Sequence, residues 1–256
     1  LTVMTPKERK RIYTLLGPQK IAEIFAYLDE PQIYFSELSV KDAAKVVSLM
    51  DSDDAVDVLE TLDDKKKYEI VENLDKAAIK DVKMLLSYDD DEIGSCMTTN
   101  YICIPKGLSV RQAMSELVRQ AGTNDNISTI YVLDESLKFA GAIDLKDLII
   151  ARKHDVLDDI IVRSYPSVTD HEKIDDCMEK IMDYSEDSIP VLSQDGHMLG
   201  VITSEDIVEM VDNEMGEDYA KLAGLTAEED LKETTAQSMK KRLPWLIILL
   251  FLGMLV

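Results

Sequence analysis

Hydrophobic residues recur every twelve positions between about residues 20 and 90. Within one unit, Val46, Val47 and Met50 are spaced as on one face of a helix. Asp and Ser residues stand between the units, as at Asp51–Asp53 and Asp75, where they are favourable helix N-caps. The pattern predicts a stack of short helices, each of which buries its apolar face on its neighbours. One series of repeated positions is Leu38, Met50, Leu62, Leu74 and Leu86.

A second repeat, with a spacing of 59 residues, covers the middle of the chain. Ile130–Leu133 matches Ile189–Leu192, and Gly141–Leu148 matches Gly200–Ile207. Each copy follows an amphipathic helical run and contains two short strand-like runs, and the dipeptide Asp195-Gly196 is a hairpin turn signal. The order expected in each copy is helix, strand, turn, strand, helix. The whole chain is therefore expected to be an α+β protein of several domains, with an all-α superhelix first.

The last eleven residues, Leu246–Val256, carry no charge. At about 1.5 Å per residue they cover about half of a ~30 Å hydrocarbon core. Lys240–Arg242 and Trp245 precede them, and basic residues and an aromatic residue typically flank a membrane span on its cytoplasmic side. The pattern favours the start of a first transmembrane helix, with the charged part of the chain in the cytosol. A buried core helix would show the same composition.

The chain of 256 residues has 50 acidic and 28 basic residues, a net charge of −22. Such a surface repels nucleic acid and anionic membranes and attracts cations. The three cysteines and three histidines do not have zinc-ligand spacing. The sequence also lacks a P-loop and an evident Ser/His/Asp or Cys/His arrangement, so it does not indicate an enzyme.

The segment 204–218 contains seven carboxylates and no Lys, Arg or His. On a helical wheel its apolar residues gather on one side, and its acids gather on the other. Most such faces are simply solvated, but solvated helices usually alternate Lys with Glu at i, i+4. Carboxylates without His or Cys favour hard cations, Mg²⁺ or Ca²⁺, and no EF-hand loop supports Ca²⁺. The segment is therefore a candidate Mg²⁺-binding surface.

The tandem repeat resembles a pair of cystathionine-β-synthase (CBS) domains, which implies the order β-α-β-β-α in each copy. The matching features are Met97-Thr98, the I-P-V-L strand at Ile189–Leu192 and the G-h-h-T-x-x-D motif at Gly200–Asp206. With the twelve-residue repeat in front and the basic-aromatic segment behind, the whole chain resembles the cytosolic region of an MgtE-family magnesium transporter. The implied domains are a helical superhelix (1–92), CBS domain 1 (93–157), CBS domain 2 (158–208), a plug or connecting helix (209–242) and the start of a transmembrane helix (243–256).

The resemblance implies a gating mechanism. At low Mg²⁺ the helical domain swings away from the CBS pair and the pore can open. At high Mg²⁺ several regulatory ions bridge the helical domain, the CBS pair and the plug helix, and the pore closes. The family further implies a homodimer, a transmembrane pore domain beyond this chain, and a multi-pass protein of the cell membrane whose region described here is cytoplasmic. No nucleic acid is expected as a partner.

The metal ligands carried over from the resemblance fall in three groups. The acids along the plug region, from Asp206 to Asp218, match the family best. Glu23 and Asp57 lie in the helical repeat and align less clearly. Asp91 and Asp175 are either inter-domain ligands or plain helix-cap and surface acids. Just before Ile189, Ser185 stands where an acid is expected, followed by Glu186 and Asp187. The candidate ligands are Glu23, Asp57, Asp91, Asp175, Asp206, Glu209, Glu214, Glu217 and Asp218.

CBS pairs often bind adenine nucleotides, with the Thr and Asp of the motif near the ribose and phosphates. Thr203 and Asp206 fit that pattern, so ATP is a possible second ligand. The first copy has Asp144 at the Thr position, and its carboxylate would repel phosphate. The alternative function is accordingly an adenine-nucleotide sensor that regulates another membrane protein.

Overall fold

The computed structural model describes residues 1–211 except 2, 29, 125, 153–154, 183–185 and 209. The chain divides into two units, Leu1–Ser204 and Glu205–Val256. The expected transmembrane start (243–256) and nearly all of the expected plug helix (209–242) lie outside the described residues. Within the described part, no helix is both long enough and apolar enough to cross a membrane.

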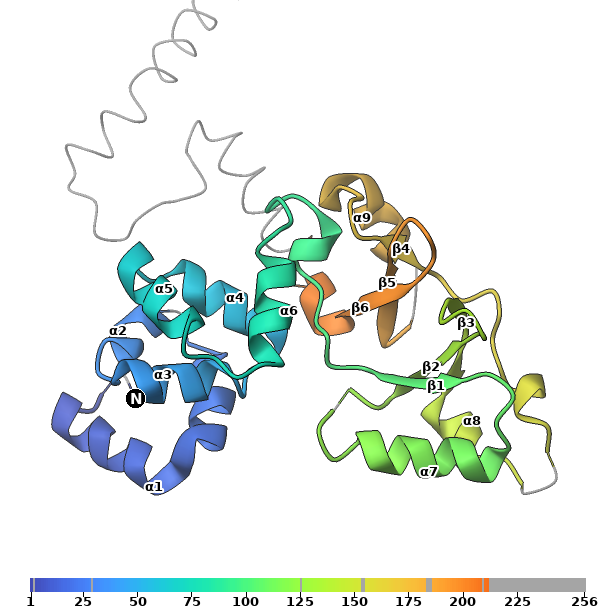
Figure 1. Cartoon of the computed structure of the whole chain (residues 1–256), viewed down its shortest axis with the longest axis horizontal. Coiled ribbons are helices and arrows are strands. Elements are labelled where there is room, and N and C mark those ends of the chain that lie inside the picture. The colour runs from blue at the N-terminus through green and yellow to red at the C-terminus, as the bar shows by residue number, and fades with distance from the viewer. Residues whose placement is uncertain are drawn as a thin grey trace, which may run out of the picture. The chain divides into compact units, whose positions relative to one another are not determined.

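Six helices form the N-terminal part of the first unit (Figure 1). Three of them begin twelve residues apart, at Val40, Ser52 and Asp64, which confirms the helical repeat. The side chains of Ser39 and Asp63 accept backbone N–H bonds at two of these starts, as expected of N-caps. The helices are α1 (Pro6–Phe25), α2 (Pro31–Phe35), α3 (Val40–Val47), α4 (Ser52–Glu60), α5 (Asp64–Val71) and α6 (Ala78–Leu85).

The helices stack by contacts between alternate members of the series. Helix α1 packs on α3, α3 packs on α5, and α4 packs on α6. The repeated apolar positions supply the core, and Val47, Leu59 and Ile70 are buried. Helix α1 is kinked at Gly17, whose φ of 74° lies in the left-handed region, and Pro18 follows. This kink was not expected from the repeat pattern.

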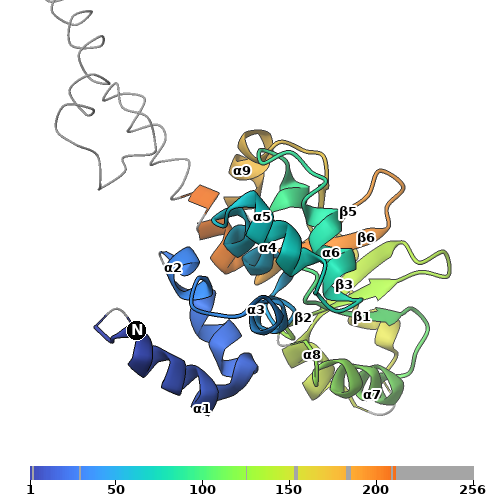
Figure 2. The same ribbon diagram turned by 60° about the vertical axis from the view of Figure 1, so that its left-hand side comes forward.

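The 59-residue repeat forms two sheets of three strands each (Figures 1 and 2). In both sheets the first strand runs parallel to the second, and the second runs antiparallel to the third. Both sheets also have a bulge at the same repeat position, Val132/Leu133 and Val191/Leu192. The elements are β1 (Ile102–Pro105), α7 (Val110–Gln120), β2 (Thr129–Leu133), β3 (Phe139–Asp144), α8 (Leu145–Ile150), β4 (Val168–Thr169), α9 (Ile174–Met182), β5 (Ser188–Leu192) and β6 (Met198–Thr203), with 3-10 turns η1 (Ile93–Ser95) and η2 (Leu157–Asp159).

The two copies exchange short segments. Thr98, which precedes the first copy, pairs with Val201 on β6 of the second copy through two backbone hydrogen bonds of 2.8 and 2.9 Å. Val162, which follows the first copy, pairs in the same way with Ala142 on β3. Gly200 allows the first of these approaches, because a Cβ there would lie 2.7 Å from the Thr98 carbonyl oxygen.

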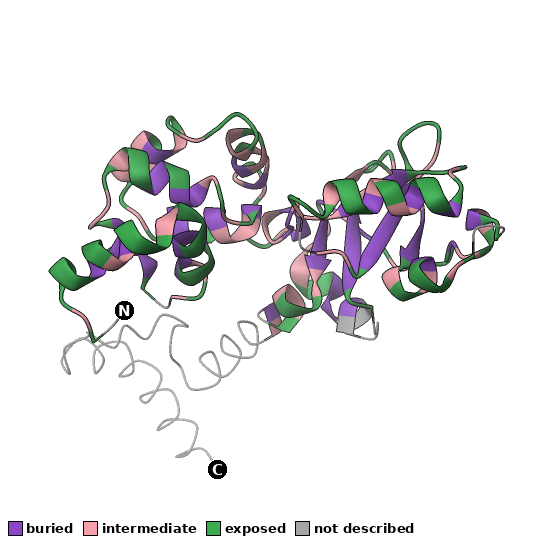
Figure 3. Ribbon diagram, turned by 90° about the horizontal axis from the view of Figure 1, so that it is seen from below, coloured by how far each residue is buried: buried purple, intermediate pink, exposed green. Residues whose placement is uncertain are grey.

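Tyr131 joins the two sheets at their shared core, which Figure 3 shows as buried strands. Its hydroxyl lies 2.6 Å from the Ser188 hydroxyl of the second copy, and Ser188 is fully buried. Tyr101, Phe139 and Tyr165 surround the Tyr131 ring. Burial raises the pKa of Tyr131, which keeps this phenol neutral. The two copies therefore form one folded body.

A second junction ties the end of the helical repeat to the second copy. Tyr88 donates a hydrogen bond of 3.1 Å to Asp170, and Gly94 donates its backbone N–H to the Asp170 carbonyl at 2.8 Å. His171 lies between Glu92, at 3.1 Å, and Asp170, at 3.8 Å. Burial raises the pKa of Tyr88 to about 12, so its hydroxyl remains a donor at neutral pH.

Candidate functional site

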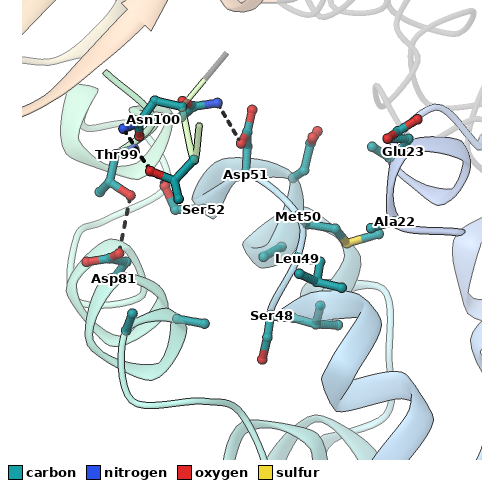
Figure 4. Close-up of a pocket in the computed structure, with 18 of the residues that line it drawn as sticks. Ala22, Glu23, Ser48, Leu49, Met50, Asp51, Ser52, Asp81, Thr99 and Asn100 are labelled. Atoms are coloured by element: carbon teal, nitrogen blue, oxygen red, sulfur yellow. Dashed lines mark hydrogen bonds between the residues drawn. The ribbon is translucent and has the colours of Figure 1, made fainter. Parts of the chain in front are cut away.

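A cavity of about 850 Å³ lies between the N-terminal helices and the segment that enters β1 (Figure 4). Its walls come from α1, from the starts of α4 and α6, from Thr99 and Asn100, and from the end of α7. Among the described residues that line it, none is Lys, Arg or His. Five of the lining residues are acids: Glu23, Asp51, Asp54, Asp75 and Asp81. The negative charge of the chain is thus concentrated around an open space that can hold hydrated cations.

The acids reach the cavity because of where the helices begin and end. Glu23 is in the last turn of α1, where its half-exposed side chain pairs with Lys20 at 2.6 Å. Asp51 precedes the first residue of α4. Asp75 caps the turn before α6 by accepting the backbone N–H groups of Ala77 and Ala78. The loops between repeats therefore gather carboxylates on one side of the stack.

Three hydrogen bonds cross the cavity between the helices and the entry to β1 (Figure 4). The Thr99 backbone N–H donates to the Ser52 hydroxyl at 2.9 Å. The Thr99 hydroxyl donates to an Asp81 carboxylate oxygen at 3.3 Å. The Asn100 side-chain amide donates to an Asp51 carboxylate oxygen at 3.0 Å. Two of the five acids thus accept hydrogen bonds from neutral donors on the far side of the cavity.

Among the expected metal ligands that the structure describes, Glu23 is the one that lines this cavity. Asp57 lies on α4 with its side chain exposed, and it is not among the lining residues. Asp91 accepts a hydrogen bond of 2.6 Å from Lys173, which lowers the pKa of the Asp91 carboxyl. Asp175 is exposed in the first turn of α9, next to the Ile174 backbone N–H that donates to the Asp91 carbonyl.

Most of the remaining expected ligands cannot be compared with the structure. Glu209, Glu214, Glu217 and Asp218 lie outside the described residues, as does Ser185. Thr203 ends β6 and is half-buried, and Asp206 belongs to the second unit. For these residues the metal and nucleotide assignments stay predictions.

Asp51, Asp54, Asp75 and Asp81 were missing from the expected ligands. The sequence did mark Asp51 and Asp75 as helix caps, and a cap explains an acid without a further role. The repeat period also carried a signal, because successive inter-helix joints of a stack meet at one side. A search for acids at equivalent joints would have found part of this group.

The side chains that line the cavity offer oxygen atoms from carboxylates, hydroxyls and amides, which suit Mg²⁺. Among the described residues, no three His, Cys, Asp or Glu side chains come close enough to hold a bare metal ion. Mg²⁺ keeps several of its water molecules when it binds. The cavity therefore fits hydrated ions that bridge separate carboxylates, and it does not provide a closed coordination cage.

The fold defines a class of protein in which an all-α superhelical domain precedes a tandem CBS pair, and the family comparisons agree. Residues 1–91 match the family described as MgtE intracellular N domain. Residues 92–154 and 157–213 match the CBS domain. Among solved structures, the soluble part of a magnesium transporter is 31% identical, with a TM-score of 0.79 over 83% of this chain and 85% of that chain. The chain belongs to the MgtE family, as its resemblance indicated.

Curated relatives carry the name Magnesium transporter MgtE. The protein from Enterococcus faecalis is 39% identical over 252 residues, which are 97% of this chain and 55% of that protein. The protein from Bacillus subtilis is 30% identical over 257 residues, 98% of this chain and 56% of that protein. The cytosolic domain of the Mg²⁺ channel MgtE in complex with ATP is a further structural neighbour, 26% identical, with a TM-score of 0.74 over 80% of this chain and 85% of that chain. The chain spans about half the length of the curated relatives it matches.

Proposed function

We propose that this chain is the Mg²⁺-sensing region of a magnesium transporter and that Mg²⁺ closes the transporter by bridging its acidic surfaces. The observation that supports this best is the acidic cavity, lined by five carboxylates and, among the described residues, by no base. The cavity lies between the two parts that match the MgtE N domain and the CBS domain. An ion held there would join those two parts directly.

The physical basis is electrostatic. Two unit charges ~4 Å apart interact by roughly 4 kcal/mol at an effective dielectric constant of ~20, so facing carboxylates separate when no cation is present. Cations that bind the docked arrangement preferentially shift the population towards it. About 5.5 kcal/mol of differential binding moves a two-state gate from 1:99 to 99:1, and several weak sites can supply it together.

Glu23 and Asp54 are the strongest candidate ligands in the described part of the chain. Both line the cavity from its helical side, Glu23 on α1 and Asp54 on α4. Asp206, Glu209, Glu214, Glu217 and Asp218 remain proposed ligands on the plug side, from the resemblance to the family. Asp57 and Asp175 stay secondary candidates. Asp91 is the weakest of the expected set: like Glu23 it already pairs with a lysine, Lys173, and unlike Glu23 it is not among the lining residues of the cavity.

A Mg²⁺ titration of the purified chain tests the proposal. Millimolar Mg²⁺ is expected to make the chain more compact in small-angle scattering and to protect the segment around residues 86–100 from protease, compared with NaCl of equal ionic strength. Glu23→Gln and Asp54→Asn should shift the effect to higher Mg²⁺. Asp64→Asn removes the same charge from an exposed position away from the cavity and is the matched control. Unchanged scattering and protection in Mg²⁺ would sink the proposal.

Nucleotide binding is a second candidate function, supported by the structural neighbour solved with ATP. We propose Thr203 and Asp206 as the contacts. In the first copy, Asp144 accepts the backbone N–H of Lys146 at 2.6 Å and so caps α8, which makes a second nucleotide site there unfavourable. Calorimetry with ATP should give one site per chain that Thr203→Val weakens. ATP binding without any response to Mg²⁺ would favour a nucleotide sensor.

We further propose that the chain works as a homodimer attached to its own transmembrane pore domain, with this region in the cytoplasm of a multi-pass membrane protein. Ile149 and Ile150, at the end of α8, are 62% and 66% exposed and offer an apolar surface for a second copy. Sedimentation equilibrium should show a dimer that Ile150→Glu weakens. A monomer at every concentration would contradict the dimer. No catalytic activity is proposed.

A further inference from the structure

Thr99 and Asn100 place uncharged donors opposite the acids of the cavity. Asn100 donates its amide to Asp51, and Thr99 bonds to Ser52 and Asp81. We propose that these two residues form a cation-independent latch that sets the Mg²⁺ concentration at which the N-terminal helices dock on the CBS pair. The latch rests on the proposed gating function, and it assigns to Thr99 and Asn100 a positioning role that does not require them to bind ions.

The latch is anchored on the CBS side by the segment exchange. Thr98 is held to Val201 by two backbone hydrogen bonds, so the next two residues leave a fixed point of the sheet. The Asn100 backbone N–H also donates to the Thr98 hydroxyl at 3.3 Å. Because the backbone is fixed on both sides of Thr99, the donors are oriented towards the helices before docking occurs.

The latch is anchored on the helical side by the start of α4. Ser52 is the first residue of α4 and is 7% exposed, and its hydroxyl accepts the Thr99 backbone N–H. Asp51 is the N-cap residue of α4 but does not use its side chain to cap the helix. Its carboxylate accepts the Asn100 amide instead. The Asp51 side chain, which could have capped α4, thus connects the helices to the segment that enters β1.

The chemistry separates the cavity acids into two groups. A carboxylate that accepts an amide or hydroxyl hydrogen bond is partly satisfied without a cation, and such bonds are stronger than those between neutral groups. Asp51 and Asp81 belong to this group. Glu23, Asp54 and Asp75 accept none of the latch bonds; Glu23 pairs with Lys20, and Asp75 accepts the backbone N–H groups of Ala77 and Ala78. Fewer bridging ions are then required for docking than the number of acids suggests.

The experiment measures the Mg²⁺ midpoint of protease protection at residues 86–100 in the full chain. Asn100→Ala should weaken docking about threefold to tenfold, the factor that one hydrogen bond contributes, and so raise that midpoint with unchanged steepness. Asn100→Asp places a carboxylate opposite Asp51, so its midpoint should rise and its Mg²⁺ dependence should steepen, because one more ion is needed. Asn124→Ala is the matched control, since Asn124 lines the same cavity but bonds to the Gln120 carbonyl of its own helix.

A midpoint for Asn100→Ala equal to that of Asn124→Ala would overturn the latch, as would a lower midpoint for Asn100→Asp. The same variants are compared in EDTA, where the latch predicts faster cleavage of Asn100→Ala than of the unmodified chain. If the unmodified chain does not respond to Mg²⁺, the gating proposal fails, and the EDTA comparison still decides the latch. Thermal unfolding of all variants checks that each one folds.

Discussion

Tyr88 shows how one hydroxyl group can hold a junction together. Asp170 is 7% exposed, and its carboxylate Oδ1 has no hydrogen-bond partner among the described residues. Its other oxygen receives the Tyr88 hydroxyl at 3.1 Å and faces His171 at 3.8 Å. The buried charge therefore depends on Tyr88, because an unsatisfied carboxylate in a protein interior is costly.

Tyr88→Phe is expected to destabilise the chain by about 1–3 kcal/mol, the cost of leaving a buried polar group without its partner. Urea unfolding followed by circular dichroism measures the loss. Tyr68→Phe removes the same hydroxyl from a residue that is 67% exposed, and it should leave the free energy of unfolding unchanged. Equal effects of the two substitutions would contradict this explanation.

Glu37 should make the free energy of unfolding of the chain decrease at acid pH. Arg9 donates to both Glu37 oxygens, and Tyr13 donates to one of them. The Arg9 hydrogen bonds, more than any other group, hold the pKa of Glu37 below its usual value. A carboxyl whose pKa is lowered by folding stabilises the fold above its unfolded pKa, and this contribution is lost as pH falls through the folded pKa.

Thermal unfolding between pH 7 and pH 3 tests this expectation. The melting temperature should fall as the pH drops below about 4.5, where unfolded glutamate begins to gain its proton. Glu37→Gln should lower the melting temperature at pH 7 and flatten its decline at acid pH. Glu72→Gln, at an exposed position, is the control and should keep the full pH dependence. A Glu37→Gln curve parallel to that of the unmodified chain would refute the assignment.

At the scale of single residues, the sequence indicated acidic surfaces but not which acids share the cavity. The excess of carboxylates without His or Cys pointed to Mg²⁺, and Glu23 does line the cavity. Asp51 was missed because an acid at a helix joint is already explained as a cap, and Asp81 was missed because it stands inside a helical run, within α6. Their second role depends on Thr99 and Asn100, which come from another part of the chain.

The secondary-structure elements follow the periodic patterns closely. Apolar residues at a twelve-residue period predicted the helical stack, and three helix starts keep that period. Helix α6 departs from it and begins at Ala78, because Asp75 first caps a turn through Ala77 and Ala78. The kink at Gly17 was also missed, since the repeat pattern describes residues 20–90 and does not reach it.

Gly200 is expected to be intolerant of substitution, because a Cβ there meets backbone as well as a side chain. Gly200→Ala would place the new carbon 2.7 Å from the Thr98 carbonyl oxygen and 2.8 Å from the Met97 sulfur. Displacing β6 from this segment should cost about 1–3 kcal/mol, as other overpacked positions do. Urea unfolding provides the measurement. Gly122→Ala, whose Cβ has no neighbour nearer than 3.9 Å, is the control, and a similar loss there would contradict the argument.

For the whole molecule, the net charge of −22 opposes compaction. Salt screens such repulsion, so NaCl should raise the melting temperature of the chain. MgCl₂ at equal ionic strength should raise it further, because bound ions add specific stabilisation of the folded state. Differential scanning fluorimetry in the two salts measures the difference. Equal curves would show that screening alone accounts for the effect.

The architecture of the whole molecule was predictable because two independent repeats follow each other in a distinctive order. The exchange of segments between the two copies was not predictable. Thr98 and Val201 pair through backbone atoms across about one hundred residues, and such long-range pairing leaves no local pattern of side chains to recognise. The sequence showed only that position 200 is a glycine, the residue whose missing Cβ permits the close approach of Thr98.

That exchange has a consequence for synthesis on the ribosome. Met97 and Thr98 emerge first, but their partner strand β6 follows about one hundred residues later, which takes about 5–20 s at 5–20 residues per second. During that interval Met97, which is fully buried in the finished fold, has no partner to cover it. The segment that precedes the first copy therefore reaches its final place only after the second copy has been made, and a nascent chain stalled before Met198 would leave that segment and β5 without their β6 partner.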